Sequence, residues 1–215
     1  MHRYKNIVDH YEKCFEKFGD ECRGVDWPDL RGAEIRYEVM LDLIPVPQSE
    51  SERYSLLDFG CGCGHLYDYM KKTNKYDYID YTGLDISEKF ASHTSRKGLR
   101  VIKNDLMKED LDECFDYIVF NGVFTEKCDL GDDEMFGYFT DMILKSWPFA
   151  KKGMAFNVMS KNVDWERDDL FHLSMDKLTD FLFKNSMKNF VIRNDYGLYE
   201  YTTYLYKETQ CRNRS

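Results

Sequence analysis

The sequence lacks any hydrophobic run long enough to cross a membrane. A membrane-spanning helix needs roughly 18–20 consecutive apolar residues, and no apolar run of this chain approaches that length. The first residues, MHRYKNIVDHYEKC, carry charges throughout and contain no hydrophobic region typical of a signal peptide. We therefore expect a cytoplasmic protein.

Positive charge is also scarce. The 215 residues include 30 Lys and Arg against 39 Asp and Glu, which gives a formal net charge of −9. A surface this acidic repels phosphate backbones, so stable nucleic-acid binding is disfavoured. We interpret the short basic end, CRNRS, as a frayed terminus and expect residues 210–215 to be flexible.

The sequence has cysteines but no CxxC pair. Seven cysteines are scattered along the chain, at positions 14, 22, 61, 63, 114, 128 and 211. Their odd number and irregular spacing indicate neither a disulfide framework nor a zinc site. We interpret Cys61 and Cys63 as small residues that fit a tight turn, and we predict no metal site.

The order of hydrophobic patterns predicts the fold. Apolar residues at helical spacing indicate two helices within the first forty residues. From residue 54, apolar strands alternate with helices, which is typical of a mainly parallel sheet covered on both faces. The last two strands are too close together for a helical crossover, so they must form an antiparallel hairpin. We predict a three-layer α/β/α Rossmann-like fold with a seven-stranded, mostly parallel sheet.

The same patterns predict the domain organisation. Residues 1–50 are expected to form an N-terminal helical cap or lid, and residues 51–209 the main domain. In open sheets of this kind, ligands bind beyond the carboxyl ends of the strands, where the strand order reverses. The loops that follow the predicted parallel strands should therefore surround one site.

The stretch LLDFGCGCGHLYDYM, residues 56–70, is the first candidate ligand loop. The dinucleotide fingerprint G-x-G-x-x-G is incomplete, because His65 stands where its third glycine belongs. Asp58, at the end of the strand, opposes a pyrophosphate and suits an ammonium group. This loop therefore favours a ligand with an amino-acid end over a nicotinamide dinucleotide.

Three further markers follow the next strands. Asp85 in GLDIS is placed to accept hydrogen bonds from both hydroxyls of a ribose. In KNDLM, Asp105 can accept from an adenine amino group while the Leu106 amide donates to a ring nitrogen. Asn121 in VFNGVF is expected to point into the site. Each marker is weak alone, but their order along successive strand ends is specific.

With these residues in view, the chain resembles the class I S-adenosylmethionine-dependent methyltransferases over roughly residues 30–208. LLDFGCGCG is similar to the glycine-rich motif of that family, and GLDIS and NDL are similar to its ribose and adenine positions. The resemblance implies S-adenosylmethionine (SAM) as cofactor and a methyl-transfer activity.

The resemblance also implies roles for individual residues. Asp58 and the loop backbone at Gly60, Cys61, Gly62 and Gly64 would hold the methionyl amino end, and Asp85 the ribose. Ile86 would pack on the adenine, Asp105 and Leu106 would read its edge, and Asn121 would lie near the methionine moiety.

The acceptor side is less defined. His172, in the loop SKNVDWERDDLFHLS, is the candidate general base because of its intrinsic pKa, although it can equally be a surface or helix-capping residue. Arg36, expected near Trp27, is a candidate clamp for the cofactor carboxylate, or else an exposed helix residue. Tyr11 is a candidate cover for the methionyl end, or a core residue.

The acceptor itself is expected to be a small molecule. FNGVF lacks the [DN]-P-P-[YFW] motif of methyltransferases that act on nucleobase amines and glutamine. In general texture the chain is similar to small stand-alone bacterial methyltransferases of surface-polysaccharide and natural-product pathways. That similarity implies methylation of an oxygen, or a nitrogen, of a sugar, sugar nucleotide or related metabolite. A non-catalytic SAM-binding partner subunit, a protein methyltransferase and a nucleotide-dependent oxidoreductase remain alternatives.

Overall fold

The computed structural model describes residues 4–207. Residues 1–3 and 208–215, with the tail expected to be flexible, lie outside the described part. Within residues 4–207, the strands are β1 (Tyr54–Phe59), β2 (Ile79–Asp85), β3 (Val101–Lys103), β4 (Phe115–Phe120), β5 (Ala150–Ser160), β6 (His172–Leu173), β7 (Phe190–Arg193) and β8 (Glu200–Tyr206). The helices are α1 (Lys5–Phe18), α2 (Leu30–Leu41), α3 (His65–Thr73), α4 (Glu88–Ser95), α5 (Asp132–Ser146) and α6 (Met175–Lys184), with short 3₁₀ helices η1 (Cys22–Val25) and η2 (Trp147–Phe149).

The described strands form one sheet in the order β3-β2-β1-β4-β5-β8-β7, and β6 pairs with β5 beside this path. β1 pairs in parallel with both β2 and β4, while β8 runs antiparallel to β5 and β7. The mostly parallel sheet with a C-terminal antiparallel hairpin is therefore confirmed, although the sheet of the described residues has eight strands where seven were expected. β6 was not predicted, because two residues are too few to form a hydrophobic pattern.

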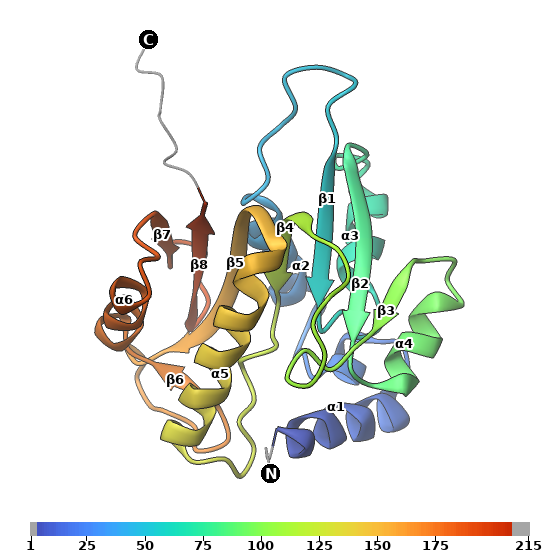
Figure 1. The fold of residues 1–215 in the computed structure, drawn as a ribbon. Coiled ribbons are helices and arrows are strands. Elements are labelled where there is room, and N and C mark those ends of the chain that lie inside the picture. Colours follow the sequence, from blue (N-terminus) through green and yellow to red (C-terminus); the bar gives the residue numbers. More distant parts are fainter. Residues whose placement is uncertain (1–3, 208–215) are drawn as a thin grey trace.

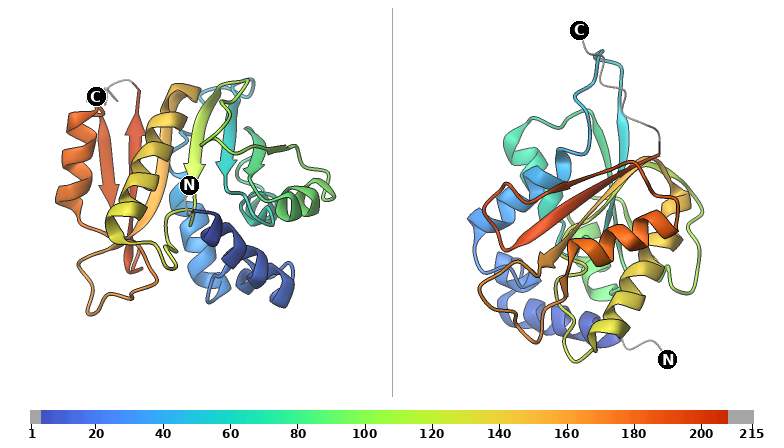
Figure 2. Two further views of the ribbon diagram at one scale, coloured as in Figure 1. Left: turned by 60° about the horizontal axis from the view of Figure 1, so that its bottom comes forward. Right: turned by 90° about the vertical axis from the view of Figure 1, so that its left-hand side faces the viewer.

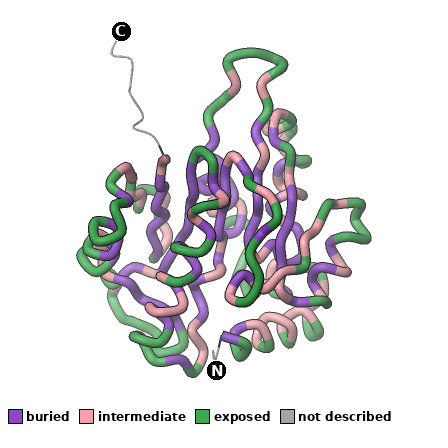
Figure 3. Tube along the Cα trace, in the orientation of Figure 1, coloured by how far each residue is buried: buried purple, intermediate pink, exposed green. Residues whose placement is uncertain are grey.

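The core is built on both faces of the sheet. Successive residues of a strand point to opposite faces, and Leu57 and Ile118 pack in one apolar cluster with α5 and α6. Their neighbours Leu56 and Val119 pack in the other cluster, with α2 and α3. Figure 1 shows α5 in front of the sheet and α2 and α3 behind it. Figure 3 shows the central strands buried along most of their length.

Helix α1 does not cover a face of the sheet. It lies beneath the arrowheads of β1, β2 and β4 in Figure 1, and it keeps to that end of the molecule in both views of Figure 2. Two tyrosine hydroxyls fix it there: Tyr4 donates to Asp105 Oδ2 (2.7 Å) and Tyr11 donates to the carbonyl oxygen of Gly122 (3.1 Å). The first helix therefore closes over the carboxyl edge of the sheet.

The two N-terminal helices occupy different places. α2 shares an apolar core with β1 and β4, whereas α1 lies at the end of the sheet. The expected boundary near residue 50 stays a prediction. Among residues 4–207, no helix is both long and apolar enough to span a membrane.

Candidate cofactor and acceptor site

A cavity lies where the strand order reverses, between the carboxyl ends of β1, β2 and β4 and the inner side of α1. Its lining includes Tyr11 from α1, Asp58 and the glycine loop after β1, Asp85 after β2, and Asn121 after β4. Three of the four strand-end markers predicted from sequence are thus brought together: the glycine loop, Asp85 and Asn121.

The glycine loop takes a conformation that side chains would disturb. Gly60 has φ = 70°, in the left-handed region that glycine favours. A Cβ atom there would meet Val123 Cγ2 at 2.7 Å. The loop is also tied to β2, because the amides of Gly60 and Cys61 both donate to the carbonyl oxygen of Leu84, at 2.7 and 3.0 Å. The loop is therefore a preformed edge of the cavity.

Asp58 is a buried carboxyl in the cavity wall. Only 3% of its surface is exposed, and it accepts a hydrogen bond from the Tyr81 hydroxyl at 2.7 Å. Burial raises the pKa of Asp58 to about 7; the Tyr81 hydrogen bond opposes this rise and nearby Asp85 adds to it. Within residues 4–207, no Lys, Arg or His forms an ion pair with Asp58. A cationic ligand would therefore supply the charge that this carboxyl lacks.

Asp85 closes the next position along the edge. Its Oδ1 accepts from the Ser87 amide (2.8 Å) and its Oδ2 from the Gly62 amide (3.0 Å). Burial raises its pKa to about 6, against the lowering effect of these backbone hydrogen bonds. The two carboxylate oxygens together have about four acceptor positions, so the backbone donors, including the Ile86 amide, leave room for a ligand. Ile86, next in sequence, also lines the cavity.

Asp105 and Leu106, which are predicted to contact the edge of the adenine, lie outside the cavity lining. Asp105 already accepts from the Tyr4 hydroxyl, and Lys108 Nζ lies 2.6 Å from the same oxygen. Leu106 is fully buried in the core, and neither residue is part of the cavity lining. Their contact with adenine stays a prediction. The lining here contains Phe90 and Tyr138 instead, two aromatic residues that the sequence analysis did not single out.

Asn121 has the character expected of a ligand contact. It lines the cavity, and its Oδ1 is buried without a hydrogen-bond partner. An unpaired buried oxygen costs about 1–3 kcal/mol, so a donor from a ligand would be favoured there. Tyr11 lines the cavity and also packs against the core, and its role as a cover for the methionyl end stays a prediction.

The structure differs from the expectation that Arg36 clamps the cofactor carboxylate. It does lie near Trp27, with its guanidinium 4.2 Å above the indole ring, as expected. However, its Nε donates to Glu200 Oε2 at 2.8 Å, and it is not part of the cavity lining. Glu200, 1% exposed, also accepts from Asn157, whose Oδ1 accepts from the Gly122 amide. Arg36 therefore neutralises a buried carboxylate instead of clamping a ligand.

The expectation that His172 acts as a general base is also wrong. It lies in β6, outside the main cavity, and is only 7% exposed. Its Nδ1 lies 2.7 Å from the carbonyl oxygen of Ser160, and its Nε2 accepts from the Arg167 amide at 3.2 Å. Both ring nitrogens are therefore engaged by backbone groups, which leaves no free position for a general base. His172 is not the cap of α6, because that cap is Ser174, whose side chain accepts from the Lys177 amide.

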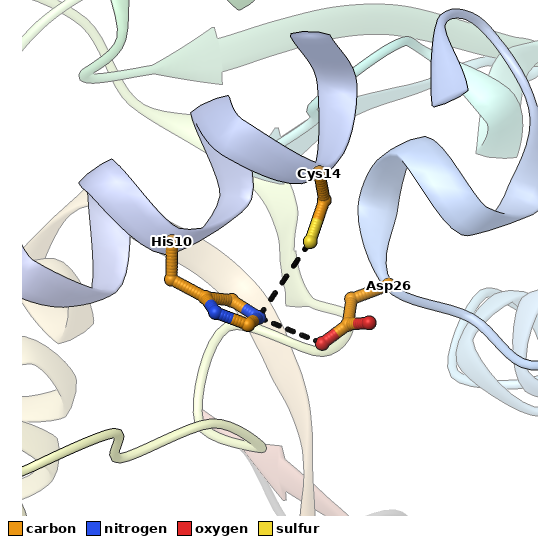
Figure 4. Close-up of side chains that lie close together, drawn as sticks. All are labelled: His10, Cys14 and Asp26. Carbon is orange, nitrogen blue, oxygen red and sulfur yellow. Dashed lines mark hydrogen bonds and ion pairs between the residues drawn. The ribbon is translucent and has the colours of Figure 1, made fainter. Parts of the chain in front are cut away.

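The structure adds polar residues that the sequence analysis missed. His10, Cys14 and Asp26 lie together beside the cavity, on α1 and at the end of η1 (Figure 4). Glu126, in the loop after β4, is 7% exposed. Burial raises its pKa to about 7, with repulsion from Asp26 and Asp169. The spacing of His10 and Cys14, one helical turn apart, was the only sequence signal for this group.

The comparisons with known proteins agree with the geometry. A family model described as a methyltransferase domain matches residues 57–131. The candidate methyltransferase Rv1506c of Mycobacterium tuberculosis is 28% identical over 155 residues, which cover 71% of this chain and 92% of that protein.

Two solved structures illustrate the shared fold. One is magnesium protoporphyrin IX methyltransferase from Synechocystis PCC 6803 with bound SAM (TM-score 0.61, 16% identity, 95% of this chain and 97% of that one). Another is 1,6-didemethyltoxoflavin-N1-methyltransferase from Burkholderia thailandensis (TM-score 0.56, 15% identity, 95% and 86%). The domain match and the mycobacterial relative, together with the shared fold, support a class I S-adenosylmethionine-dependent methyltransferase.

Proposed function

We propose that the protein transfers the methyl group of SAM, held along the carboxyl edge of β1, β2 and β4, to a small-molecule acceptor. The observation that carries the site assignment is Asp58. A carboxyl in the cavity wall, 3% exposed and without a cationic partner within residues 4–207, is the complement of an α-ammonium group. Buried charges are tolerated when they are paired and hydrogen-bonded.

The rest of the cofactor follows the edge of the sheet. The backbone of Gly60, Cys61 and Gly62 forms the wall next to the methionyl end, while Gly64 lies outside the cavity lining. Asp85 accepts from the ribose hydroxyls through the lone pairs that its backbone hydrogen bonds leave free. Ile86, Phe90 and Tyr138 give an apolar slot for adenine, with Asp105 and Leu106 behind it. Asn121 Oδ1 meets a donor of the methionine moiety.

Methyl transfer from SAM requires mainly that the protein position the two reactants. SAM, when bound, supplies an already activated methyl group. The protein holds the two reactants in line, and orientation of this kind is worth up to about 7–11 kcal/mol. Tyr11, Trp27 and Tyr37 line the same cavity. Aromatic faces contribute about 0.5–2 kcal/mol of attraction to a nearby cation. Helix α1 covers the cavity and keeps water out.

Three observations favour a small acceptor. The cavity lies under α1, so a macromolecular side chain would have to pass this helix. The net charge of −9 opposes nucleic acids. Two proteins of similar fold, the protoporphyrin and toxoflavin methyltransferases, are named for small-molecule substrates. An oxygen or nitrogen of a sugar, sugar nucleotide or related metabolite is the acceptor class we favour.

The experiment has two stages. Calorimetric titration with SAM and S-adenosylhomocysteine should give micromolar binding that Asp85→Ala abolishes. Asp80→Asn, on the exposed part of the same strand, is the matched control and should bind normally. Absence of binding by the folded protein would contradict the proposal.

The second stage identifies the acceptor class. Incubation with methyl-labelled SAM and separated cell fractions should place label in the small-molecule fraction. Label in protein alone would replace the small acceptor with a protein substrate. Binding without any transfer would favour the non-catalytic partner-subunit alternative.

A further inference from the structure

Beside the cavity lies a compact group of three metal-ligating side chains. His10 and Cys14 are one turn apart on α1, and Asp26 follows η1 (Figure 4). His10 Nε2 lies 2.8 Å from Asp26 Oδ2 and 3.8 Å from Cys14 Sγ. All three ligand atoms lie within 4.8 Å of one another. Three different donor types therefore converge on one point.

The backbone fixes this convergence. Asp26 has φ = 60° and ψ = 27°, a left-handed conformation that Asp adopts more readily than most residues. η1 also packs tightly against the end of α1, since a Cβ atom on Gly24 would come within 1.9 Å of the Gly19 carbonyl oxygen. The two ligand-bearing segments are thus held in one arrangement by main-chain contacts.

A second group of similar composition shows what sets this one apart. Asp20, Cys63 and His65 also lie within reach of a common point. There, however, Lys97 Nζ lies 2.9 Å from Asp20 Oδ2, and His93 contacts the same oxygen. A resident ammonium already neutralises that carboxylate. Within residues 4–207, Asp26 has no Lys or Arg ion pair, and its only salt-bridge partner is His10.

The surroundings of the first group are acidic. Glu126 is buried and interacts electrostatically with Asp26 and Asp169. One nearby cation, Arg167, is committed to Asp169 through two hydrogen bonds, and another, Lys17, acts on Cys14. Excess negative charge around a partly exposed pocket attracts a divalent cation.

The donor set identifies the metal class. A thiolate, an imidazole and a carboxylate are ligands of zinc, whereas Mg²⁺ and Ca²⁺ take oxygen ligands. Ligands bound about 2.0–2.3 Å from a tetrahedral zinc ion lie about 3.3–3.8 Å apart. The observed N–S separation of 3.8 Å already fits. The N–O pair needs to open by about half an ångström.

We propose that His10, Cys14 and Asp26 bind a zinc ion, with the fourth position open to water or an acceptor group. The ligands alternate in sequence with residues of the cavity wall: His10 precedes Tyr11, and Asp26 stands between Val25 and Trp27. The metal therefore fastens α1 to η1 and fixes the wall that faces the acceptor. This inference is independent of the acceptor class.

Cobalt(II) is the probe, because its thiolate complexes absorb in the near ultraviolet and its tetrahedral complexes in the visible. Chelator-treated full-length protein should bind one cobalt ion per chain, which zinc displaces. Cys14→Ser should remove the thiolate band. Loss of an outer-shell partner typically lowers metal affinity by about 10–100-fold. Loss of a direct ligand, in His10→Gln or Asp26→Asn, should lower the cobalt affinity by more than that.

Controls separate this site from the other thiols. Cys114→Ser changes an exposed cysteine and should leave the cobalt spectrum unchanged. Circular dichroism checks that each variant is folded, and hydrogen exchange of α1 should slow when zinc binds the wild type but not Cys14→Ser. No cobalt binding, or a thiolate band that survives Cys14→Ser and disappears in Cys63→Ser, would overturn the proposal.

Discussion

The two halves of the sheet's carboxyl edge are built differently. On the β1–β2 side, one contiguous loop and the carboxyls of Asp58 and Asp85 face the cavity. Backbone hydrogen bonds hold the loop and Asp85 in place, and the Tyr81 hydroxyl holds Asp58. On the β4–β5 side, Arg36, Glu200 and His172 use their polar atoms for structural contacts. Apart from Asn121 and Glu126 after β4, the open functional groups of that side come from α1 and η1. One half is preformed for a cofactor, and the other becomes a site only when the N-terminal segment lies across it.

We call the β4–β5 side of this edge the acceptor half and the β1–β2 side the cofactor half. The largest effect on stability is expected from breaking the buried ion pair of the acceptor half, between Arg36 and Glu200. Arg36→Met leaves Glu200 as a buried, unpaired carboxylate and should lower the free energy of unfolding by about 3–5 kcal/mol. Arg53→Met, which breaks an exposed pair with Asp80, is the matched control and should change it by about 1 kcal/mol or less. Denaturant titration measures both. Unchanged stability with lost SAM binding would restore Arg36 as a cofactor clamp.

The next largest effect is expected on the SAM affinity of the cofactor half. Asp58→Asn keeps the size of the side chain but removes the charge opposite the ammonium group. SAM affinity should fall by at least about 30-fold, equivalent to about 2 kcal/mol, as calorimetry would measure. The free protein should become more stable at neutral pH, because an uncompensated buried carboxyl is gone. Equal SAM affinity in variant and wild type would place the amino end elsewhere.

The pH dependence of stability and of SAM affinity tests the same role of Asp58. The pKa of Asp58 rises from 3.8 in the unfolded chain to about 7 in the folded one. The folded state therefore binds more protons between about pH 4 and 7, and its stability falls as pH rises through that window. SAM prefers the ionised carboxyl, so its affinity should rise about tenfold from about pH 5.5 to 7.

Asp58→Asn provides the control for this pH profile. It should flatten both trends, leaving the smaller contribution of Asp85, whose pKa is about 6. Thermal unfolding and calorimetry across the pH range measure the two trends. An affinity that stays flat over this range in the wild type would argue against an ionising Asp58 in the SAM site.

The smallest effect on catalysis is expected at His172. His172→Gln loses hydrogen bonds to Ser160 and Arg167, which should cost about 1–2 kcal/mol of stability. Methyl transfer by the folded variant should stay within about threefold of the wild type, since no ring nitrogen faces the cavity. A loss of more than about 100-fold in kcat with normal folding would make His172 a general base after all.

The sequence predicted the cofactor half well because its signals are local. A strand, a glycine loop and an acidic strand end lie within short stretches, and parallel strands bring their ends to one edge. Gly60, Asp85 and Asn121 therefore lie together as expected. The position of Tyr4 against Asp105 depends on α1, so no local pattern near Asp105 revealed it.

The acceptor half was harder to predict because its contacts are distant in sequence. Arg36 and Glu200 are 164 residues apart, and their pairing depends on the whole sheet. His172 was judged by intrinsic pKa, which says nothing of the backbone groups that engage its ring. The absence of CxxC pairs led to the prediction of no metal site, yet the ligands that we now propose come from two separate segments.

A crystal structure of the protein with S-adenosylhomocysteine would show where the cofactor lies. We expect the amino group within hydrogen-bonding distance of Asp58, the ribose hydroxyls on Asp85 and the adenine against Ile86 and Tyr138. A ligand bound elsewhere, or with its amino group turned away from Asp58, would contradict this expectation.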